Sequence, residues 1–576
     1  FVTSLADARS HFGRLCPKGQ AGVQTLYDPY RIQHPLKRVG SRGSGKWETI
    51  TWTQAFSEIA AKINTQIPFA QRNTTLIDSS SADLGKIANQ LIYSPGRSIE
   101  KPVSERIFKA GYGTANYGID HTSICEVSHH TGNELMTTDH IAGTGATNHF
   151  KTDLLKAQYM LVFGGNPVEA NFPMLALARG IAVMRDLSRS GGAGKVVIVD
   201  PRFSNSAAKA DQWVPIKPGG DSALALGMGR VMLTNATYNT AYLQNANKAA
   251  ATAKSESTYT DASWLVIIDS SHANYRKFLT ATEAGISSPL AGANPVCISL
   301  GTSTAIEAAV SGSNPTAAYG ELDSGEVTVN GIKCRSSFGL YKDSVLSMSL
   351  HEYASICGIS ESTITQMATD FTSYGRKASA WSYRGAVQHT NGTYTQMAIM
   401  ALNWMIGNVD YAGGLGKGGG AWSETNATGG VNVATVTGGG TVSGPRIDRA
   451  KGSTYNSTKS YYVGTPTPRP WFPFASHGNF QELIPSIEDE YPYSAKVLIT
   501  YWNAWPYSVP GGKATWERTV SDEVKLPLFV AISPVMGEVP AWADYILPDQ
   551  IFFLTLGLLC LTLGIVHISY QLALSS

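Results

Sequence analysis

Short apolar runs alternate with amphipathic stretches along this chain. Residues 159–163 (YMLVF) and 196–199 (VVIV) predict two buried strands, and residues 173–187 between them predict a helix. Strand, helix and strand at this spacing indicate a βαβ unit with parallel strands. Further helices are predicted at 222–233 and 395–405, and further strands at 497–501 and 528–532. The pattern therefore predicts an α/β protein with parallel sheets.

Residues 48–67 read as a short strand followed by an amphipathic helix. Phe56, Ile59 and Ile63 share one face of this helix, and Thr53 is the predicted N-cap. Two other regions interrupt the alternation. Residues 235–335 are rich in Ala, Ser, Thr and Asn and predict an inserted or peripheral region. Residues 411–446 are dominated by glycine and predict a long loop able to cover a site.

Composition narrows the class of protein. The 576 residues are 43% hydrophobic and 15% charged, which predicts several domains with a large core and argues against intrinsic disorder. A net charge of +2 without basic blocks gives no reason to expect nucleic-acid binding. None of the six cysteines forms a CxxC pair, so the sequence holds neither a complete zinc motif nor a complete iron–sulfur motif.

The end of the sequence changes character abruptly. Residues 551–573 contain no Asp, Glu, Lys or Arg and are long enough to span a bilayer. Because the break falls inside a recognisable motif, a frameshift or a chimeric assembly is the favoured interpretation over a membrane anchor. No initiator methionine or signal peptide is visible.

Three loops resemble phosphate- and ribose-binding turns. Residues 161–173 (LVFGGNPVEANFP) pass from a strand through two glycines into a helix, whose free amides favour phosphate. Asp200 follows the next strand, in the position that often binds ribose, and Arg202 is suited to pair with a phosphate. Residues 218–221 (PGGD) precede another helix, although Asp221 also suits a simple capping role. Together the loops favour a dinucleotide-like ligand over tight turns alone.

Two more clusters hold candidate chemistry. Residues 382–414 crowd Arg384, Gln388, His389 and Asn391 before a helix; a buried structural histidine is the alternative for His389. Cys125 is either an inert buried thiol or a soft metal ligand, and its histidine neighbours are either substrate-binding and proton-delivering groups or ordinary loop residues. These neighbours are His121, His129 and His130.

As a set, six motifs resemble the molybdenum oxidoreductases of the DMSO-reductase superfamily. They are LCPKGQAG (15–22), GGNPVE (164–169), VDPRFSNSAAKAD (199–211), PGGDSALAL (218–226), RGAVQHTNGT (384–393) and ADYILPD (543–549). The resemblance implies a multi-domain fold around molybdenum, or tungsten, held by two molybdopterin guanine dinucleotides (bis-MGD). Judged by the same resemblance, the β-rich C-terminal domain of such proteins is expected to be missing from this chain. A simple NAD-dependent dehydrogenase lacks support because no GxGxxG motif is in place.

The resemblance also assigns residues. Cys125 matches the ligand of molybdenum, Cys16 matches the fourth ligand of a [4Fe-4S] cluster, and Lys18 matches the lysine between that cluster and a pterin. The first three cluster cysteines are absent, so this chain should not hold the cluster. One dinucleotide would be lined by Gly164, Gly165, Asn166, Pro167, Glu169, Asp200, Arg202, Gly219 and Asp221, and the other by Arg384, Gly385, Gln388, His389 and Asn391.

Within the superfamily the chain is most similar to tetrathionate and arsenate reductases. Arsenate reductases tend to have a lysine shortly after the metal ligand, where this chain has His129 and His130; residues 468–474 (PRPWFPF) also favour tetrathionate. The resemblance implies reduction of a small anion in anaerobic respiration and a periplasmic location. It also implies two partners, an iron–sulfur electron-transfer subunit with a membrane quinol-oxidising subunit. Polysulfide, thiosulfate or arsenate reduction is the alternative, as is a non-catalytic homologue acting as a scaffold. The truncated chain itself is expected to be inactive.

The same resemblance divides the chain. Residues 1–55 are expected to be the remnant of an iron–sulfur domain. Residues 56–130 and 340–550 are expected to form a second, α/β domain. Residues 131–339 are expected to form a Rossmann-like dinucleotide-binding domain with an insertion, followed at the end of the chain by the apolar tail, 551–576.

Overall fold

The computed structural model describes residues 17–97, 105–139, 141, 143–170, 174–186, 193–287, 292–310, 315–417, 439–450, 471 and 478–549. The chain forms two compact units. The first unit comprises residues 1–14 and 128–419, and the second comprises residues 15–127 and 420–576. Cys16, the apolar tail and most of the predicted loop at 411–446 lie outside the described residues.

A four-stranded parallel sheet forms the centre of the first unit. Its strands are β13 (Ala378–Ser382), β5 (Tyr159–Phe163), β6 (Lys195–Val199) and β7 (Gln212–Val214), in that spatial order. Apolar side chains fill both faces of β5 and β6, as expected of a parallel sheet covered on both sides. Residues 340–417, grouped by the sequence analysis with the terminal part of the chain, thus contribute β13 to this sheet.

Helices cover both faces of this sheet. On one face, Leu161 and Val197 pack with helices α8 (Asp221–Thr234), α13 (Glu361–Ser373) and α14 (Gly392–Ile406). On the other face, Val162 and Ile198 pack with α7 (Met174–Met184) and with the strand pair β4 (Phe150–Thr152) and β14 (Leu415–Lys417). The alternation of side chains along each strand divides the core into these two layers.

The region predicted to be peripheral has small sheets and a core of its own. One antiparallel sheet joins β11 (Val327–Val329), β12 (Ile332–Ser336) and β8 (Leu265–Ile267), and β9 (Val296–Ile298) pairs with β10 (Ala305–Glu307). Leu265, Leu279 and Val296 are among its buried residues. The other helices of the first unit are α6 (Val127–Leu135), α9 (Thr240–Leu243), α10 (Lys248–Ala253), α11 (Ser337–Leu346) and α12 (Leu350–Cys357).

The second unit contains a six-stranded mixed sheet. Its spatial order is β2 (Trp47–Thr49), β1 (Leu36–Arg38), β17 (Tyr545–Leu547), β16 (Leu528–Ile532), β15 (Val497–Tyr501) and β3 (Leu91–Pro95). The last four strands are parallel, and β1 and β2 extend the sheet in antiparallel fashion.

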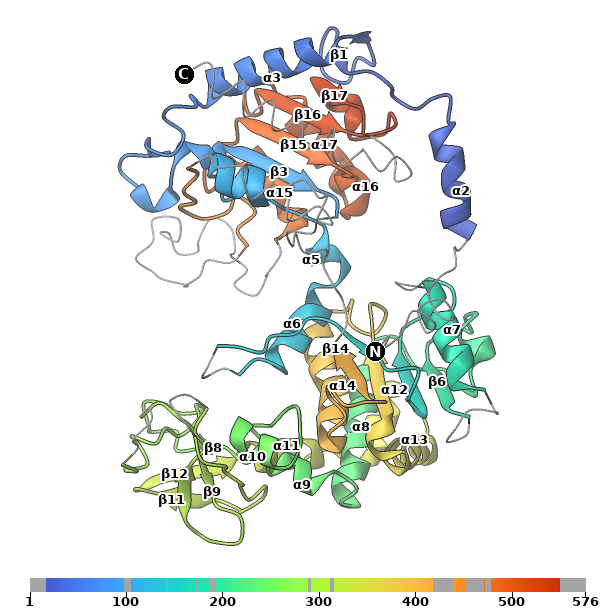
Figure 1. The fold of residues 1–576 in the computed structure, drawn as a ribbon, viewed down its shortest axis with the longest axis vertical. Helices are drawn as coiled ribbons and strands as arrows, with labels where there is room; N and C mark the ends of the chain where they lie inside the picture. Colours follow the sequence, from blue (N-terminus) through green and yellow to red (C-terminus); the bar gives the residue numbers. More distant parts are fainter. Residues whose placement is uncertain are drawn as a thin grey trace. The chain divides into compact units, whose positions relative to one another are not determined.

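Two helical layers enclose this second sheet. Helix α3 (Trp52–Gln66) lies along one face, and α15 (Leu483–Glu488), α16 (Trp505–Ser508) and α17 (Gly512–Val520) lie on the other (Figure 1). Ile59 packs with the face that includes Val497, and Trp516 packs with the opposite face that includes Leu498. Helix α2 (Pro17–Leu26), the π-helix η3 (Glu105–Tyr112) and the short α5 (Thr122–Cys125) complete the unit's main elements.

The strands and helices named from hydrophobic periodicity are confirmed within a few residues. The predicted N-cap Thr53 is wrong, because α3 begins at Trp52 and Thr51 caps it by accepting a hydrogen bond from Gln54 N at 3.1 Å. Within the described ranges, no helix is long and apolar enough to cross a membrane.

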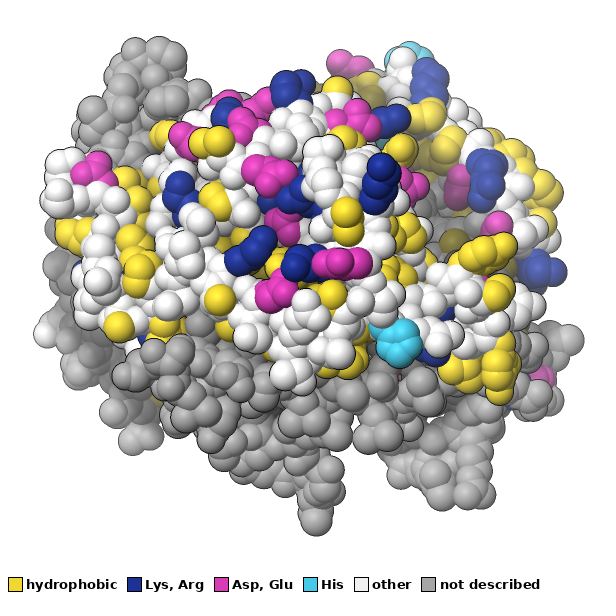
Figure 2. Space-filling model, turned by 90° about the horizontal axis from the view of Figure 1, so that it is seen from above, with side chains coloured by type: hydrophobic (Ala, Val, Ile, Leu, Met, Phe, Trp, Pro, Cys, Tyr) yellow, Lys and Arg dark blue, Asp and Glu magenta, His cyan; other side chains and the backbone are white. Residues whose placement is uncertain are grey.

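The surface drawn in Figure 2 mixes the two signs of charge. Lysine and arginine side chains stand beside aspartate and glutamate on this face instead of gathering into one block. On this face, the described residues therefore offer no extended basic stripe of the kind that tracks a nucleic-acid backbone.

Candidate functional site

The carboxyl ends of β13, β5, β6 and β7 bring the predicted cofactor loops to one edge of the first unit's sheet. The chain proceeds from β5 to β6 and β7 on one side, whereas β13 lies on the other side of β5. Open α/β sheets bind ligands outside the carboxyl ends of the strands at such a reversal of strand order. The topology thus agrees with the prediction of a ligand site near the loops that follow β5 and β13.

These two loops approach each other backbone to backbone. Gly385 N donates to Gly164 O at 3.1 Å, and Gly164 N donates to Val199 O at 2.8 Å. Gly164 has a φ of +57°, a conformation that glycine adopts without strain. A Cβ on Gly164 or on Gly385 would collide with the backbone of the other loop. Two loops assigned by the sequence analysis to different dinucleotides therefore adjoin at the reversal point.

Side chains hold the loop after β5 in shape. Asn166 Nδ2 donates to Glu169 Oε2 at 2.6 Å, and Ser206 Oγ donates to Asn166 Oδ1. Val168 N in turn donates to Ser206 Oγ at 3.1 Å. The predicted residues Gly165 and Pro167 are buried in the same loop. Asn166 and Glu169 thus stabilise the turn, and the Glu169 side chain is exposed to solvent.

The loop after β6 presents an exposed guanidinium. Asp200 Oδ1 accepts a hydrogen bond from Arg202 N at 2.8 Å and so closes its own turn. The Arg202 side chain is 69% exposed and lies 3.8 Å from Glu169, a distance at which an exposed ion pair contributes little. Arg202 is therefore available to pair with a phosphate at this edge.

Asp221 is the buried carboxylate of the edge. It is the first residue of α8 and is only 4% exposed. Burial raises its pKa to about 6; the negative charge of Asp200 adds to the rise, and His389 opposes it. Gly219, two residues earlier, has a φ of +80° and open space around it. The edge therefore combines a carboxyl group that is costly to ionise with room for a ligand beside it.

The loop after β13 is exposed. Arg384, Gly385, Gln388, His389 and Asn391 are all solvent-accessible, so His389 is not the buried core histidine that was considered as an alternative. Arg384 Nη2 donates to the hydroxyl of Tyr383 at 3.3 Å. His389 lies close enough to Asp221 to oppose the rise in its pKa, which places residues from two predicted clusters near each other.

The second unit holds Cys125. This residue ends the short helix α5 and is 6% exposed. Arg97 Nη1 lies 3.0 Å from Glu126 Oε1; the Glu126 side chain is fully buried, whereas that of Arg97 is 38% exposed. Burial lowers the pKa of Arg97, but Glu126, Cys125 and Asp120 outweigh burial, and the net pKa is raised. A cationic group therefore lies close enough to Cys125 for the two to interact electrostatically, and sequence reasoning missed it because 28 residues separate the two.

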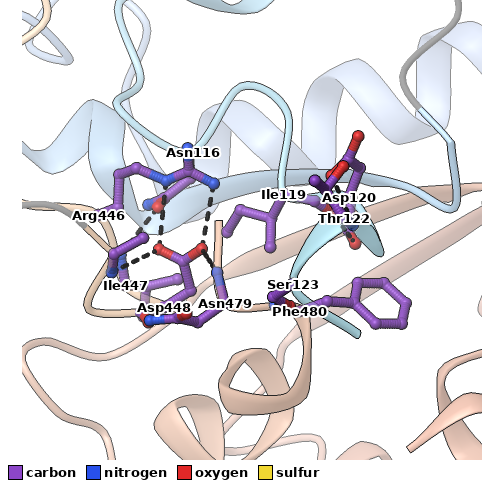
Figure 3. A network of polar contacts seen from close by, with 12 residues as sticks. Asn116, Ile119, Asp120, Thr122, Ser123, Arg446, Ile447, Asp448, Asn479 and Phe480 are labelled. Carbon is purple, nitrogen blue, oxygen red and sulfur yellow. Dashed lines mark hydrogen bonds and ion pairs between the residues drawn. The ribbon is translucent and has the colours of Figure 1, made fainter. Parts of the chain in front are cut away.

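Polar contacts fix the turn that carries Cys125 (Figure 3). Ser123 Oγ accepts from Phe480 N at 2.9 Å and bonds Gln481 Oε1 at 2.5 Å. On the preceding segment, Asn116 Oδ1 accepts from Ile447 N at 2.9 Å. The neighbouring Asp448 accepts from Asn479 N at 2.8 Å. The thiol is thus positioned by segments more than 300 residues away in sequence.

The predicted histidines divide between two settings. The ring of His121 contacts the backbone carbonyl of Gly96 through Nδ1, and its residue caps α5. His129 and His130 lie buried on α6, where His130 Nε2 is 2.9 Å from His149 Nε2. The sequence analysis did not single out His149, which precedes a three-residue strand and belongs to no motif. Lys18 is the second residue of α2.

A family model described as molybdopterin oxidoreductase matches residues 31–558 of the chain. Similar proteins include a selenate reductase chain from Mesobacillus selenatarsenatis, 33% identical over 95% of this chain and 55% of that protein. A tetrathionate reductase chain from Salmonella typhimurium is 31% identical over 94% of this chain and 53% of that protein. The molybdopterin-containing chain of the arsenate respiratory reductase from a Shewanella species is 24% identical over 93% of this chain and 50% of that protein.

Among solved structures, acetylene hydratase from Pelobacter acetylenicus matches with a TM-score of 0.55 and 17% identity. The match covers 93% of this chain and 57% of the other. At this identity the likeness shows a shared fold. The chain spans about half the length of the curated relatives that it matches.

Proposed function

The chain belongs to the molybdopterin oxidoreductase family, and from this we propose that it forms the cofactor-binding core of a catalytic subunit that reduces a sulfur or selenium oxyanion. The observation that carries the proposal is the buried Cys125 within electrostatic range of the Arg97 guanidinium, which is paired with the adjacent Glu126. A thiol suits a soft metal ligand, and the guanidinium suits an anion brought to that metal.

The first unit's edge fits a pterin dinucleotide. Its glycines let two backbones meet where any Cβ would collide, and Gly219 leaves open space at the start of α8. Arg202 and Arg384 are exposed cations suited to phosphates, and Asp221 is a buried acceptor suited to the N–H groups of a guanine base. When bound, the molybdenum or tungsten cofactor would exchange two electrons with substrate.

Arg97 carries the anion-binding argument. One of its N–H groups is directed at the fully buried Glu126, and more than a third of the side chain remains accessible. Because the negative partner is buried and the positive partner is exposed, the accessible side of the pair is positive. A dianion with several oxygens can accept more than one of the remaining guanidinium N–H groups.

Tetrathionate is the proposed substrate, as the sequence resemblance favours. Two electrons added to tetrathionate cleave its central S–S bond and give two thiosulfates. Selenate is the second candidate, because a relative of similar coverage is named selenate reductase. Selenate takes up two electrons and two protons to give selenite and water, so it differs from tetrathionate in requiring protons.

The remaining functional assignments rest on the family resemblance. They are an electron-transfer iron–sulfur subunit, a membrane quinol-oxidising subunit, a [4Fe-4S] cluster that includes Cys16, and a periplasmic location. The catalytic roles of His121, His129 and His130 stay predictions.

The test measures turnover of tetrathionate, selenate and arsenate with reduced viologen as the electron donor, using the cofactor-loaded full-length subunit that contains this chain. Arg97→Gln should raise the KM for the oxyanion by about 10–100-fold, the effect of losing ~1.5–3 kcal/mol of charged hydrogen bonding. Arg97→Lys should recover part of this loss. Cys125→Ala should abolish turnover.

The matched control is Arg518→Gln, which removes an exposed arginine from its pair with Glu488. It should leave KM unchanged. Unchanged KM in Arg97→Gln would refute the anion-binding role of Arg97. A loaded wild type that reduces none of the three anions, or a protein that takes up no pterin, would replace the enzyme proposal with the scaffold alternative.

A further inference from the structure

Three histidines converge inside the first unit. His129 and His130 are consecutive on α6, and His149 immediately precedes β4. One ring nitrogen from each lies within 4.8 Å of the others. His129 is 2% exposed and His130 is 3% exposed, so their rings are shielded from water. Three imidazoles gathered within this distance can supply the donor set of a three-histidine metal site.

The surrounding hydrogen bonds indicate the tautomer of His129. Asn133 Nδ2 donates to Asn148 O at 2.9 Å, while Asn133 Oδ1 accepts from Gln396 Nε2 at 2.7 Å. Its amide orientation is thereby fixed, and Nδ2 is the group that lies 3.3 Å from His129 Nε2. Nε2 of His129 therefore accepts this hydrogen bond. A metal bound at Nε2 displaces that one hydrogen bond, while Asn133 keeps its bonds to Asn148 and Gln396.

The other two rings are almost at ligand spacing. His130 Nε2 and His149 Nε2 are 2.9 Å apart, so in the free chain one of them donates to the other. Two nitrogens bound tetrahedrally at ~2.05 Å from zinc lie about 3.3 Å apart. The pair thus has to open by only a few tenths of an ångström. A shift of the shared proton to Nδ1 then frees both lone pairs without a change in net charge.

One nearby charge opposes the binding of a cation. The Tyr383 ring packs 5.7 Å from His129 and 6.3 Å from His149, centroid to centroid, and Lys151 Nζ lies 4.5 Å from the same Tyr383 centroid. The Lys151 ammonium also lies 4.5 Å from the Trp381 ring, so two aromatic faces partly compensate its charge. Repulsion from Lys151 therefore weakens the binding of a cation to the three histidines, so the site requires a metal that bonds strongly to imidazole.

We propose that His129, His130 and His149 bind a divalent transition-metal ion of the zinc type, distinct from the metal assigned to Cys125. Zinc accepts three imidazoles with an open fourth position, whereas magnesium and calcium prefer oxygen ligands. The ion would join α6 to the start of β4. The proposal assigns His129 and His130 a ligand role instead of the predicted substrate-binding or proton-delivering role, and it does not depend on the proposed oxyanion reduction.

The experiment titrates tag-free, chelator-treated full chain with Co²⁺ and then displaces it with Zn²⁺. The expected result is one Co²⁺ per chain with the intense visible absorption of a tetrahedral site and no thiolate-to-cobalt charge-transfer band. His149→Ala should weaken binding by at least about tenfold. Cys125→Ser should leave the spectrum unchanged.

His351→Ala is the matched control, since His351 is 81% exposed and pairs with Glu361 on the surface of the same unit. It should bind Co²⁺ like the wild type. Circular dichroism checks that each variant is folded. The proposal is overturned if the unaltered chain binds no Co²⁺ or binds it with a thiolate-to-cobalt band. It is also overturned if the His149→Ala variant binds Co²⁺ as tightly as the unaltered chain does. None of these results decides the outcome of the viologen assay, so failure of the metal-site proposal can be told apart from failure of the proposed function.

Discussion

Asp221 should make the stability of the folded chain depend on pH. Its carboxyl group is 4% exposed, and burial, helped by the charge of Asp200, raises its pKa from 3.8 to about 6. Because the folded pKa exceeds the unfolded value, the folded state binds the proton more tightly. The stabilisation is fully present below about pH 4 and is lost as the pH rises through about 6.

Asp221→Asn removes this titration while keeping the shape of the side chain. A rise of about two pKa units corresponds to about 3 kcal/mol. Since Asp221 is almost fully buried, solvent screening reduces this figure little. In the ligand-free chain, the variant should therefore gain stability relative to the wild type between pH 4 and pH 7, by up to about 3 kcal/mol. A ligand that donates hydrogen bonds to the carboxylate should reduce the gain.

The assay is chemical denaturation of both proteins at half-unit pH steps from 4 to 7, read as the difference in free energy of unfolding. The control Asp269→Asn replaces an exposed carboxyl whose pKa is lowered by hydrogen bonds from Ser271, so any pH effect there has the opposite sign and lies at the acid end. A difference for Asp221→Asn that stays constant with pH, or that falls as the pH rises, contradicts the reasoning.

Two more substitutions test how the loops are held. Gly385→Ala sets a Cβ against the carbonyl oxygen of Gly164. It should lower the free energy of unfolding by about 1–3 kcal/mol and lower the pterin content of the protein. The control Gly537→Ala places its Cβ in open space and should change neither quantity. Ser123→Ala leaves the part-buried N–H of Phe480 without its acceptor and should cost about 1–2 kcal/mol, with a lower metal content of loaded protein. The exposed Ser521→Ala is its control, and equal effects of Ser123→Ala and Ser521→Ala on both measurements would contradict a positioning role for Ser123.

Local pattern predicted the elements well because buried parallel strands are continuous apolar runs. The runs at 159–163, 497–501 and 528–532 coincide with β5, β15 and β16. The error at the start of α3 has a simple cause: Thr51 and Thr53 flank Trp52, and either hydroxyl suits an N-cap. Only the backbone of Thr51 is extended, as a capping residue requires.

Pairing between distant segments was beyond the sequence. Nothing in β13 indicates that it pairs with β5 rather than with a strand of the second unit, because both sheets accept the same apolar residues. Arg97 and His149 were missed for a related reason. Their significance comes from Glu126 and His130, which the fold brings within 3.0 Å and 2.9 Å of them, and no local periodicity records such contacts.

The sheet edge of the first unit and the turn around Cys125 in the second unit differ in what holds them, and this explains why the sheet edge was easier to predict. The loops after β5, β6 and β7 are placed by strand ends, so Gly164, Asp200 and Asp221 reach one edge once the sheet is recognised. The turn around Cys125 is placed by side chains such as Ser123 that bond to a far segment of the chain. A substitution in that far segment should therefore disturb the thiol more than its distance in sequence suggests, whereas the sheet edge should tolerate changes that preserve its glycines.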